Sequence, residues 1–378
     1  MKPELAFCLF KYFPFGGLQS DFLAIASACQ RRGFRIVVYT RSWEGDIPDG
    51  FEVRLISANA LSNHGKALRF SQQVTEELMQ RPAAAVVGFN RMPGLDIYFA
   101  ADNCYAAKAA TQRGFLYRLG RRYKTYAALE KAVFDPESAT EILLIAERQQ
   151  AEFCQYYGTP AKRMHLLPPG MNRNRSRPDN AEEIRRTVRE QLGVRKGEII
   201  LIQVGSGFVT KGVDRSIRAL TSLPSELKKK TRLLVVGKDR SAAFRRLAKK
   251  LGEEDRVDFL GGRDDVPSLL LAADLMIHPA VNEAAGIVLL EALAAGLPVL
   301  CSAACGHAVH VERSGGGLVS PEPFDQEWLN RSLLKLVSEA TTLPALGRAG
   351  LAYAEKTDFY SQHERAAEFI ADVVRRKS

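Results

Sequence analysis

The clearest signal of the fold lies in the segment His278-Pro279-Ala280-Val281-Asn282-Glu283-Ala284-Ala285-Gly286-Ile287-Val288-Leu289-Leu290-Glu291-Ala292-Leu293-Ala294-Ala295-Gly296-Leu297-Pro298. It begins with the end of an apolar strand and continues, after a short loop, into an apolar run of helix length. One carboxylate, Glu283, falls in the loop, and a second, Glu291, falls on the predicted helix. A strand that leads through a short loop into a helix is the repeating unit of a parallel, doubly wound sheet.

The same segment predicts an anion-binding site. A helix that begins near Ala285 directs its free N–H groups and positive dipole end at the preceding loop, where a diphosphate can bind. The two glutamates then offer acceptors to hydroxyl groups at the two ends of a sugar nucleotide, although two solvated glutamates beside a helix start would give the same pattern. The expected donor contacts are Glu283, Ala284, Ala285, Gly286, Ile287, Val288 and Glu291.

Apolar runs of strand length alternate with amphipathic runs of helix length on both sides of this segment. The expected strands of the N-terminal half are Leu5–Phe10, Arg35–Tyr39, Phe51–Ile56, Ala84–Phe89 and Ile142–Ile145. Those of the C-terminal half are Ile199–Val204, Leu233–Val236, Arg256–Phe259, Leu275–His278 and Pro298–Cys301. This rhythm predicts two α/β domains, each a parallel sheet covered by helices. We place them at residues 1–167, joined by a C-terminal helix over 357–378, and at residues 168–356.

Composition limits the classes of function. With 378 residues, 46% hydrophobic and 25% charged, the chain has the composition of an ordinary globular protein of two domains. Its net charge of +10 favours an anionic partner: nucleic acid, a phosphorylated small molecule or an acidic membrane surface. The six cysteines are scattered without a disulfide framework, and no apolar run is long enough to span a membrane. We therefore expect a soluble or peripheral protein in a reducing compartment.

A second phosphate-binding loop is predicted at Gln203–Asp214. There a strand leads into a glycine-rich turn, and Gly205 permits close approach of the backbone to a phosphate that Lys211 can neutralise. The dinucleotide fingerprint fails because Thr210 stands at the third glycine position, and the P-loop pattern fails as well. Arg215 and Arg173 are the candidates for a second cation.

The pair of glutamates eight residues apart, followed by Glu291-Ala292 and Gly296-Leu297-Pro298, resembles the signature of glycosyltransferase family 4. That resemblance implies retaining enzymes of the GT-B fold, two Rossmann-like domains with a cleft between them. It implies that Glu283 contacts the transferred sugar, Glu291 the ribose and Lys211 the donor phosphates. It also implies that Arg263, after the predicted strand Arg256–Phe259, lies beside the nucleotide base, the alternative being a surface turn. Many family members also have an arginine in this loop, where the present chain has Ser206 and Thr210.

The first predicted strand is followed by Gly16 and Gly17, which we expect to approach the diphosphate through their N–H groups. Asp21 follows in what we predict to be the first helical turn. Over the whole chain, the sequence resembles lipopolysaccharide core glucosyltransferases that add the first outer-core hexose to an inner-core heptose. The resemblance implies that Asp21 is a candidate acceptor base, the alternative being a partner of the helix dipole. Asn90, Arg91 and Asp96 are the expected acceptor-binding residues.

The segment Tyr105–Phe134 is rich in basic and aromatic residues. Such a helical stretch suits an anionic membrane surface, or else a solvated helical face; nucleic acid is not expected, because no recognisable binding motif accompanies the charge. The expected membrane-binding residues are Lys108, Arg113, Arg118, Arg121, Arg122 and Lys124.

No metal or other cofactor is expected. The cluster from Cys305 to Glu312 matches no zinc spacing, and the sequence has no Asp-x-Asp pair of the kind used by metal-dependent glycosyltransferases. The resemblance implies a retaining hexosyltransferase at the cytoplasmic face of a bacterial plasma membrane, and we expect it to be a monomer. It would move glucose from UDP-glucose to a heptose of the lipopolysaccharide inner core. The alternatives are UDP-galactose or a UDP-N-acetylhexosamine as donor, or another lipid-linked acceptor.

Overall fold

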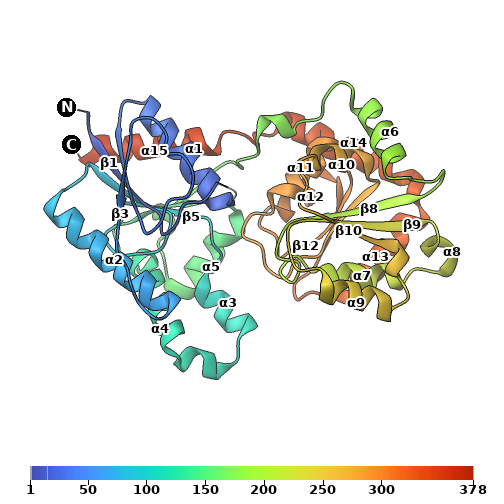
Figure 1. Cartoon of the computed structure of the whole chain (residues 1–378), viewed down its shortest axis with the longest axis horizontal. Coiled ribbons are helices and arrows are strands. Elements are labelled where there is room, and N and C mark those ends of the chain that lie inside the picture. Colours follow the sequence, from blue (N-terminus) through green and yellow to red (C-terminus); the bar gives the residue numbers. More distant parts are fainter. Residues whose placement is uncertain (1, 15, 378) are drawn as a thin grey trace. The chain divides into compact units, whose positions relative to one another are not determined.

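A computed structural model describes residues 2–14 and 16–377, and its internal contacts divide the chain into two units (Figure 1). The first unit runs to Gly170 and also includes the segment from Ser361 onward; the second is Met171–Tyr360. Both boundaries lie within a few residues of those expected from the sequence. The second unit is continuous in sequence, whereas the first is completed by a segment from the far end of the chain.

Within the described residues, the first unit contains a seven-stranded parallel sheet with the order β3-β2-β1-β4-β5-β6-β7. The strands are β1 (Glu4–Cys8), β2 (Arg35–Thr40), β3 (Phe51–Leu55), β4 (Ala85–Gly88), β5 (Ile97–Ala100), β6 (Glu141–Leu144) and β7 (Met164–Leu166). The helices are α1 (Gly17–Arg31), α2 (Asn63–Gln80), α3 (Tyr105–Gln112), η1 (Phe115–Leu119), α4 (Arg121–Phe134), α5 (Glu147–Tyr157), η2 (Ala161–Arg163) and α15 (Gln362–Lys377).

The second unit repeats this architecture with six parallel strands among the residues that the structure describes, in the order β10-β9-β8-β11-β12-β13. The strands are β8 (Ile199–Val204), β9 (Thr231–Val236), β10 (Val257–Gly261), β11 (Leu275–His278), β12 (Val299–Ser302) and β13 (Gly317–Ser320). The helices are η3 (Arg173–Arg175), α6 (Ala181–Gln191), α7 (Val213–Thr221), α8 (Ser225–Lys228), α9 (Ala242–Lys250), η4 (Glu254–Arg256), α10 (Val266–Ala272), α11 (Ile287–Ala295), α12 (Ala308–Ser314), α13 (Gln326–Ser338), η5 (Ala340–Thr342) and α14 (Leu343–Lys356).

Strand β8 shows why its sequence is a continuous apolar run. Ile200 and Ile202 pack into one hydrophobic core with residues of α10 and α11, while Leu201 packs into another with residues of α7, α9 and α13. Successive side chains of a strand point to opposite faces, so a strand with helices on both sides needs apolar residues throughout. The predicted fold class, two parallel α/β domains, is confirmed.

The strand orders identify where ligands bind in such sheets. The order reverses at the β1/β4 pair of the first unit and at the β8/β11 pair of the second. Loops that leave the carboxyl ends of these strands form the crevice at a topological switch point. In the second unit those loops contain Lys211 and Glu283, the two residues that the sequence singled out.

Helix α15 packs on α1 in the first unit, and both are found together in Figure 1. Its apolar face is buried, and the carboxylate of Glu364 pairs with both Arg31 and Arg32 at the end of α1. The sequence prediction missed β5, β7 and β13, each of three or four residues. Among the described residues, no helix combines the length and apolar character needed to span a bilayer.

Candidate functional site

The loop after β8 is shaped by glycines around Lys211. Gly205 and Gly212 have φ angles of +139° and +69°, conformations that side chains disfavour. A Cβ at Gly205 would lie 2.9 Å from Cε of Lys211, and one at Gly212 would collide with the carbonyl oxygen of Pro279. The glycines therefore allow the lysine side chain to lie against the backbone and the loop to pack on the end of β11.

Glu283, in the loop after β11, is held on both carboxylate oxygens. The ammonium of Lys211 donates to Oε1, and Nε2 of His278 lies 2.7 Å from Oε2. The Glu283 backbone is fixed too, since its N–H donates to the carbonyl of Ala304 and its carbonyl accepts from the N–H of Gly306, both at 3.1 Å. Loops far apart in sequence thus converge on one carboxylate.

This environment keeps Glu283 ionised. Burial alone would raise its pKa, but the charge and hydrogen bonding of His278 and Lys211 outweigh burial and lower the pKa to about 2. A permanent carboxylate is suited to accept hydrogen bonds from sugar hydroxyl groups.

Helix α11 begins at Ile287, two residues later than the sequence predicted, because Gly286 adopts the left-handed conformation as its N-cap. The first helical turn presents the N–H groups of Ile287 and Val288, whereas Ala284 and Ala285 belong to the preceding loop. The free N–H groups of this helix start are therefore those of Ile287 and Val288 rather than those of Ala284 and Ala285.

Glu291 lies farther along α11, with its side chain only 14% exposed. Burial raises its pKa, while the guanidinium of Arg175, 3.7 Å away, lowers it in part. Sequence reasoning missed Arg175, although it lies two residues after the candidate Arg173. Its pairing depends on the path of the chain after Gly170, which no local pattern encodes.

The other candidate cations have structural partners. The guanidinium of Arg215 lies 3.7 Å from the ring centroid of Phe324 and donates to the carbonyls of Pro279 and Ala280. Arg173 lies over the ring of Tyr360. Both guanidinium groups are therefore held by other parts of the second unit, and neither pairs with Glu283 as the ammonium of Lys211 does.

Arg263 follows β10, the strand at the edge of the second sheet, and pairs with Asp265 at 2.6 Å in an exposed loop. This contact lies within the surface turn that is the alternative to base recognition. The structure does not bring Arg263 into contact with Lys211 or Glu283.

In the first unit, Gly16 is the N-cap of α1 and Gly17 its first residue, with open space beside Gly17. Asp21 falls after the first turn of this helix rather than in it, which corrects the sequence prediction. Its carboxylate lies 2.9 Å from Nε2 of His363 on α15. Asp21 is thus engaged with the returning helix rather than with the helix dipole.

The three residues expected to bind the acceptor do not all lie at the same edge of the first sheet. Asn90 follows β4 and accepts a hydrogen bond of 2.6 Å from the N–H of Phe10, so it joins the loops after β1 and β4. Asp96 instead precedes β5, where it accepts from the N–H of Val86 and pairs with Lys377. It therefore lies at the amino edge of the sheet, opposite the edge where ligands bind, and a direct acceptor contact does not fit this position.

Arg91 is almost buried, and its guanidinium lies 3.2 Å from Glu130, whose side chain is completely buried. Glu130 also accepts from the N–H groups of Tyr105 and Ala106 at the start of α3 and from the hydroxyl of Tyr157. Arg91 therefore belongs to a cluster that ties α3, α4 and α5 together.

The basic segment that the sequence singled out consists of α3, η1 and α4 rather than one helix. At its tip, the side chains of Phe115, Leu116 and Leu119 are 74%, 79% and 57% exposed. The basic residues of the same segment are Lys108, Arg113, Arg118, Arg121, Arg122 and Lys124, of which Arg118 is half-buried and the others are exposed. The sequence prediction identified the charges and the interleaved aromatic residues, Phe115 among them, and missed the exposed Leu116 and Leu119.

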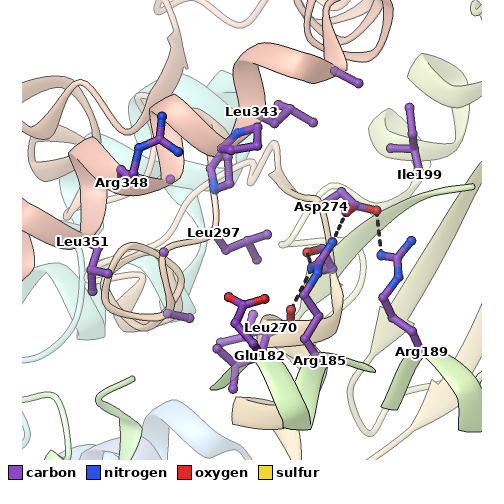
Figure 2. A pocket seen from close by; sticks show the side chains of 18 of the residues that line it. Glu182, Arg185, Arg189, Ile199, Leu270, Asp274, Leu297, Leu343, Arg348 and Leu351 are labelled. Atoms are coloured by element: carbon purple, nitrogen blue, oxygen red, sulfur yellow. Dashed lines mark hydrogen bonds and ion pairs between the residues drawn. The ribbon is translucent and has the colours of Figure 1, made fainter. Parts of the chain in front are cut away.

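A cavity of about 730 Å³ lies elsewhere in the second unit, beside the amino ends of its strands (Figure 2). Figure 2 shows Arg185 and Arg189 pointing at Asp274, with which both form ion pairs. Because these charges satisfy one another and the cavity is at the sheet edge opposite Lys211 and Glu283, we do not assign it to the donor.

His278, Glu283 and Cys305 bring possible metal-ligating atoms within 4.8 Å of one another. The sequence did not predict this group, because Cys305 reaches Glu283 only through the folding of the loop after β12. The ammonium of Lys211 already neutralises the same carboxylate. Lys211 and His278 thus engage both carboxylate oxygens of Glu283, so a cation at this group would have to displace a protein contact.

The chain belongs to the group 1 glycosyltransferases, whose family model matches residues 184–351. The sequence is 47% identical to the lipopolysaccharide glucosyltransferase WaaG of Escherichia coli K12, over 97% of this chain and 98% of that protein. The structure matches the crystal structure of WaaG, a glycosyltransferase involved in lipopolysaccharide biosynthesis, with a TM-score of 0.88 over 97% and 99% of the two chains. Anabaena HepE in complex with UDP-glucose shares the fold, at 20% identity and a TM-score of 0.72 over 98% and 100%. The predicted GT-B fold and glycosyltransferase class are confirmed.

Proposed function

We propose that this enzyme transfers glucose from UDP-glucose to a heptose of the lipopolysaccharide inner core and thereby starts the outer core. The observation that supports this most strongly is the identity of 47% to a lipopolysaccharide glucosyltransferase over nearly the full length of both chains. The convergence of Lys211 and Glu283 at the switch point of the second sheet supports a donor site of the corresponding chemistry.

The donor half of the mechanism follows from charge. Lys211 stabilises the negative charge that develops on the diphosphate as the bond to the sugar breaks, and the N–H groups of Ile287 and Val288 add hydrogen bonds. Glu283 accepts hydrogen bonds from hexose hydroxyls, and Glu291 accepts from the ribose. The acceptor hydroxyl attacks the anomeric carbon on the face from which UDP leaves, so the configuration is retained.

The reaction proceeds without a divalent metal in this proposal. A cation in metal-dependent transferases neutralises the leaving diphosphate, and here the ammonium of Lys211 supplies that charge from a loop that glycines hold against β11. Turnover in the presence of a chelator tests this feature, and a requirement for added Mg²⁺ or Mn²⁺ would contradict it.

We further propose that the monomeric enzyme binds the inner face of the bacterial plasma membrane, where its glycolipid acceptor lies. The exposed apolar side chains of Phe115, Leu116 and Leu119, on a segment that also carries exposed basic residues, support this peripheral association. Apolar side chains can enter the interface while the cations interact with anionic headgroups.

The decisive experiment measures UDP release with UDP-glucose, UDP-galactose, UDP-N-acetylglucosamine and UDP-N-acetylgalactosamine, each with truncated lipopolysaccharide that ends in inner-core heptose. We expect turnover with UDP-glucose and a product larger by one hexose. Preference for another donor would assign a different hexose, and absence of turnover with all donors would refute the proposed acceptor.

A further inference from the structure

His278 is a buried polar residue with a single evident partner. It ends β11, its side chain has no exposure, and its Nε2 lies 2.7 Å from Oε2 of Glu283. Within the part of the chain that the structure describes, its Nδ1 is buried without a hydrogen-bond partner. Burying an imidazole with one ring nitrogen unsatisfied costs free energy. A histidine at this position therefore suggests a role that depends on its contact with Glu283.

The hydrogen bond has a defined direction. An ionised carboxylate only accepts hydrogen bonds, so the proton of this bond resides on Nε2 of His278. The imidazole therefore acts as a donor to Oε2, while Lys211 is the donor to Oε1. With both oxygens engaged in this way, a hexose hydroxyl that approaches Oε1 of Glu283 would compete with the ammonium of Lys211.

The two donors differ in their freedom to move. Lys211 has a long, flexible side chain on a glycine-rich loop, and a diphosphate would attract its ammonium away from Glu283. His278 is fixed at the end of a central strand, where its backbone pairs with Cys301 of β12. Once Lys211 turns to the diphosphate, His278 remains and Oε1 becomes available.

We propose that His278 is a positioning residue that holds Oε2 of Glu283 throughout donor binding, so that Oε1 is directed at a hydroxyl group of the transferred hexose. Lys211 serves as a temporary partner of Oε1 until the diphosphate replaces it. This inference rests on the proposed donor site and adds a specific consequence: His278 affects recognition of the hexose and not of UDP.

The test compares binding of UDP and UDP-glucose by calorimetry, without acceptor, in the wild type and in His278→Leu. The matched control is His165→Leu, because Nε2 of His165 lies 2.7 Å from Glu141 in the first unit, outside the site. We expect His278→Leu to bind UDP within about twofold of wild type but UDP-glucose about tenfold to a hundredfold more weakly, the size of a lost hydrogen bond to a charged group. The control should bind both as the wild type does.

Further variants separate positioning from folding. His278→Gln keeps an N–H donor and should recover most of the lost UDP-glucose affinity. His278→Asn, whose shorter amide does not reach Glu283, should show the loss even if the leucine variant fails to fold. Equal weakening of UDP and UDP-glucose, or wild-type affinity for UDP-glucose in both His278→Leu and His278→Asn, would overturn the inference. Zinc bound to the wild type and absent from these variants would overturn it as well, whereas a wild type that binds neither nucleotide would refute the donor site itself.

Discussion

The guanidinium of Arg91 lies 3.2 Å from the carboxylate of Glu130, and the two side chains are 14% and 0% exposed. Arg91 comes from the loop after β4, while Glu130 comes from α4. The same carboxylate accepts both N–H groups that open α3. One buried pair thus attaches the basic, aromatic segment to the carboxyl edge of the first sheet.

We predict that Glu130→Gln lowers the free energy of unfolding by about 3–5 kcal/mol, because it leaves Arg91 buried without a counter-charge. Urea denaturation measures this value. Glu137→Gln, at an exposed position, is the control and should change stability little. A Glu130 variant as stable as the wild type would show that the pair contributes nothing to the fold.

Lys211→Met should reduce turnover about a hundredfold to a thousandfold, since it removes the cation that stabilises the departing diphosphate. The affinity for UDP should fall along with that for UDP-glucose, which distinguishes this variant from those of His278. Lys250→Met, on the exposed end of α9, is the control. Wild-type turnover after loss of the ammonium would exclude Lys211 from the mechanism.

Leu116→Asp should weaken binding to vesicles that contain anionic lipid, because it places a charge at the apolar tip of the basic segment. Arg121→Glu or Arg122→Glu should weaken the free energy of vesicle binding by about 1 kcal/mol or more each. Added salt should reduce the difference in binding between these variants and the wild type. The matched control is Leu61→Asp, since Leu61 is also an exposed leucine but lies outside this segment. Equal vesicle binding by the Leu116 and Leu61 variants would argue against the proposed contact.

His307 predicts a pH dependence of stability. Burial lowers its pKa from 6.5 to about 3, so the folded protein keeps the imidazole neutral while the unfolded chain protonates it below pH 6.5. The stabilising contribution is therefore complete above pH 6.5 and decreases by about 1.4 kcal/mol for each unit of pH below it. Urea denaturation between pH 7 and pH 5 should show a steeper loss for the wild type than for His307→Phe. Parallel curves would show that His307 is not the group responsible.

The sequence predicted the donor site better than the acceptor residues, for a physical reason. The strand, loop and helix around Glu283 are contiguous, so their alternation of apolar and polar residues fixes the position of the carboxylate. Asp96 was interpreted as a residue beyond the carboxyl end of β4 because the four-residue strand β5 was not recognised. Since Asp96 directly precedes β5, it lies at the amino edge of the sheet instead of the predicted carboxyl edge. The contact of His278 with Glu283 depends on how the loop after β11 folds back on the strand, and that of Arg175 with Glu291 on how two separate segments meet; neither leaves a periodic signal.

The return of α15 to the first unit has a consequence for synthesis on the ribosome. Residues 171–360 form a continuous unit that can fold as soon as it leaves the exit tunnel. The surface of α1 that α15 covers, in contrast, stays open to water until residues 362–377 have been translated. The first unit is therefore translated first but can complete its fold only after the second unit has been made. During that interval α1 is exposed and accessible to chaperones.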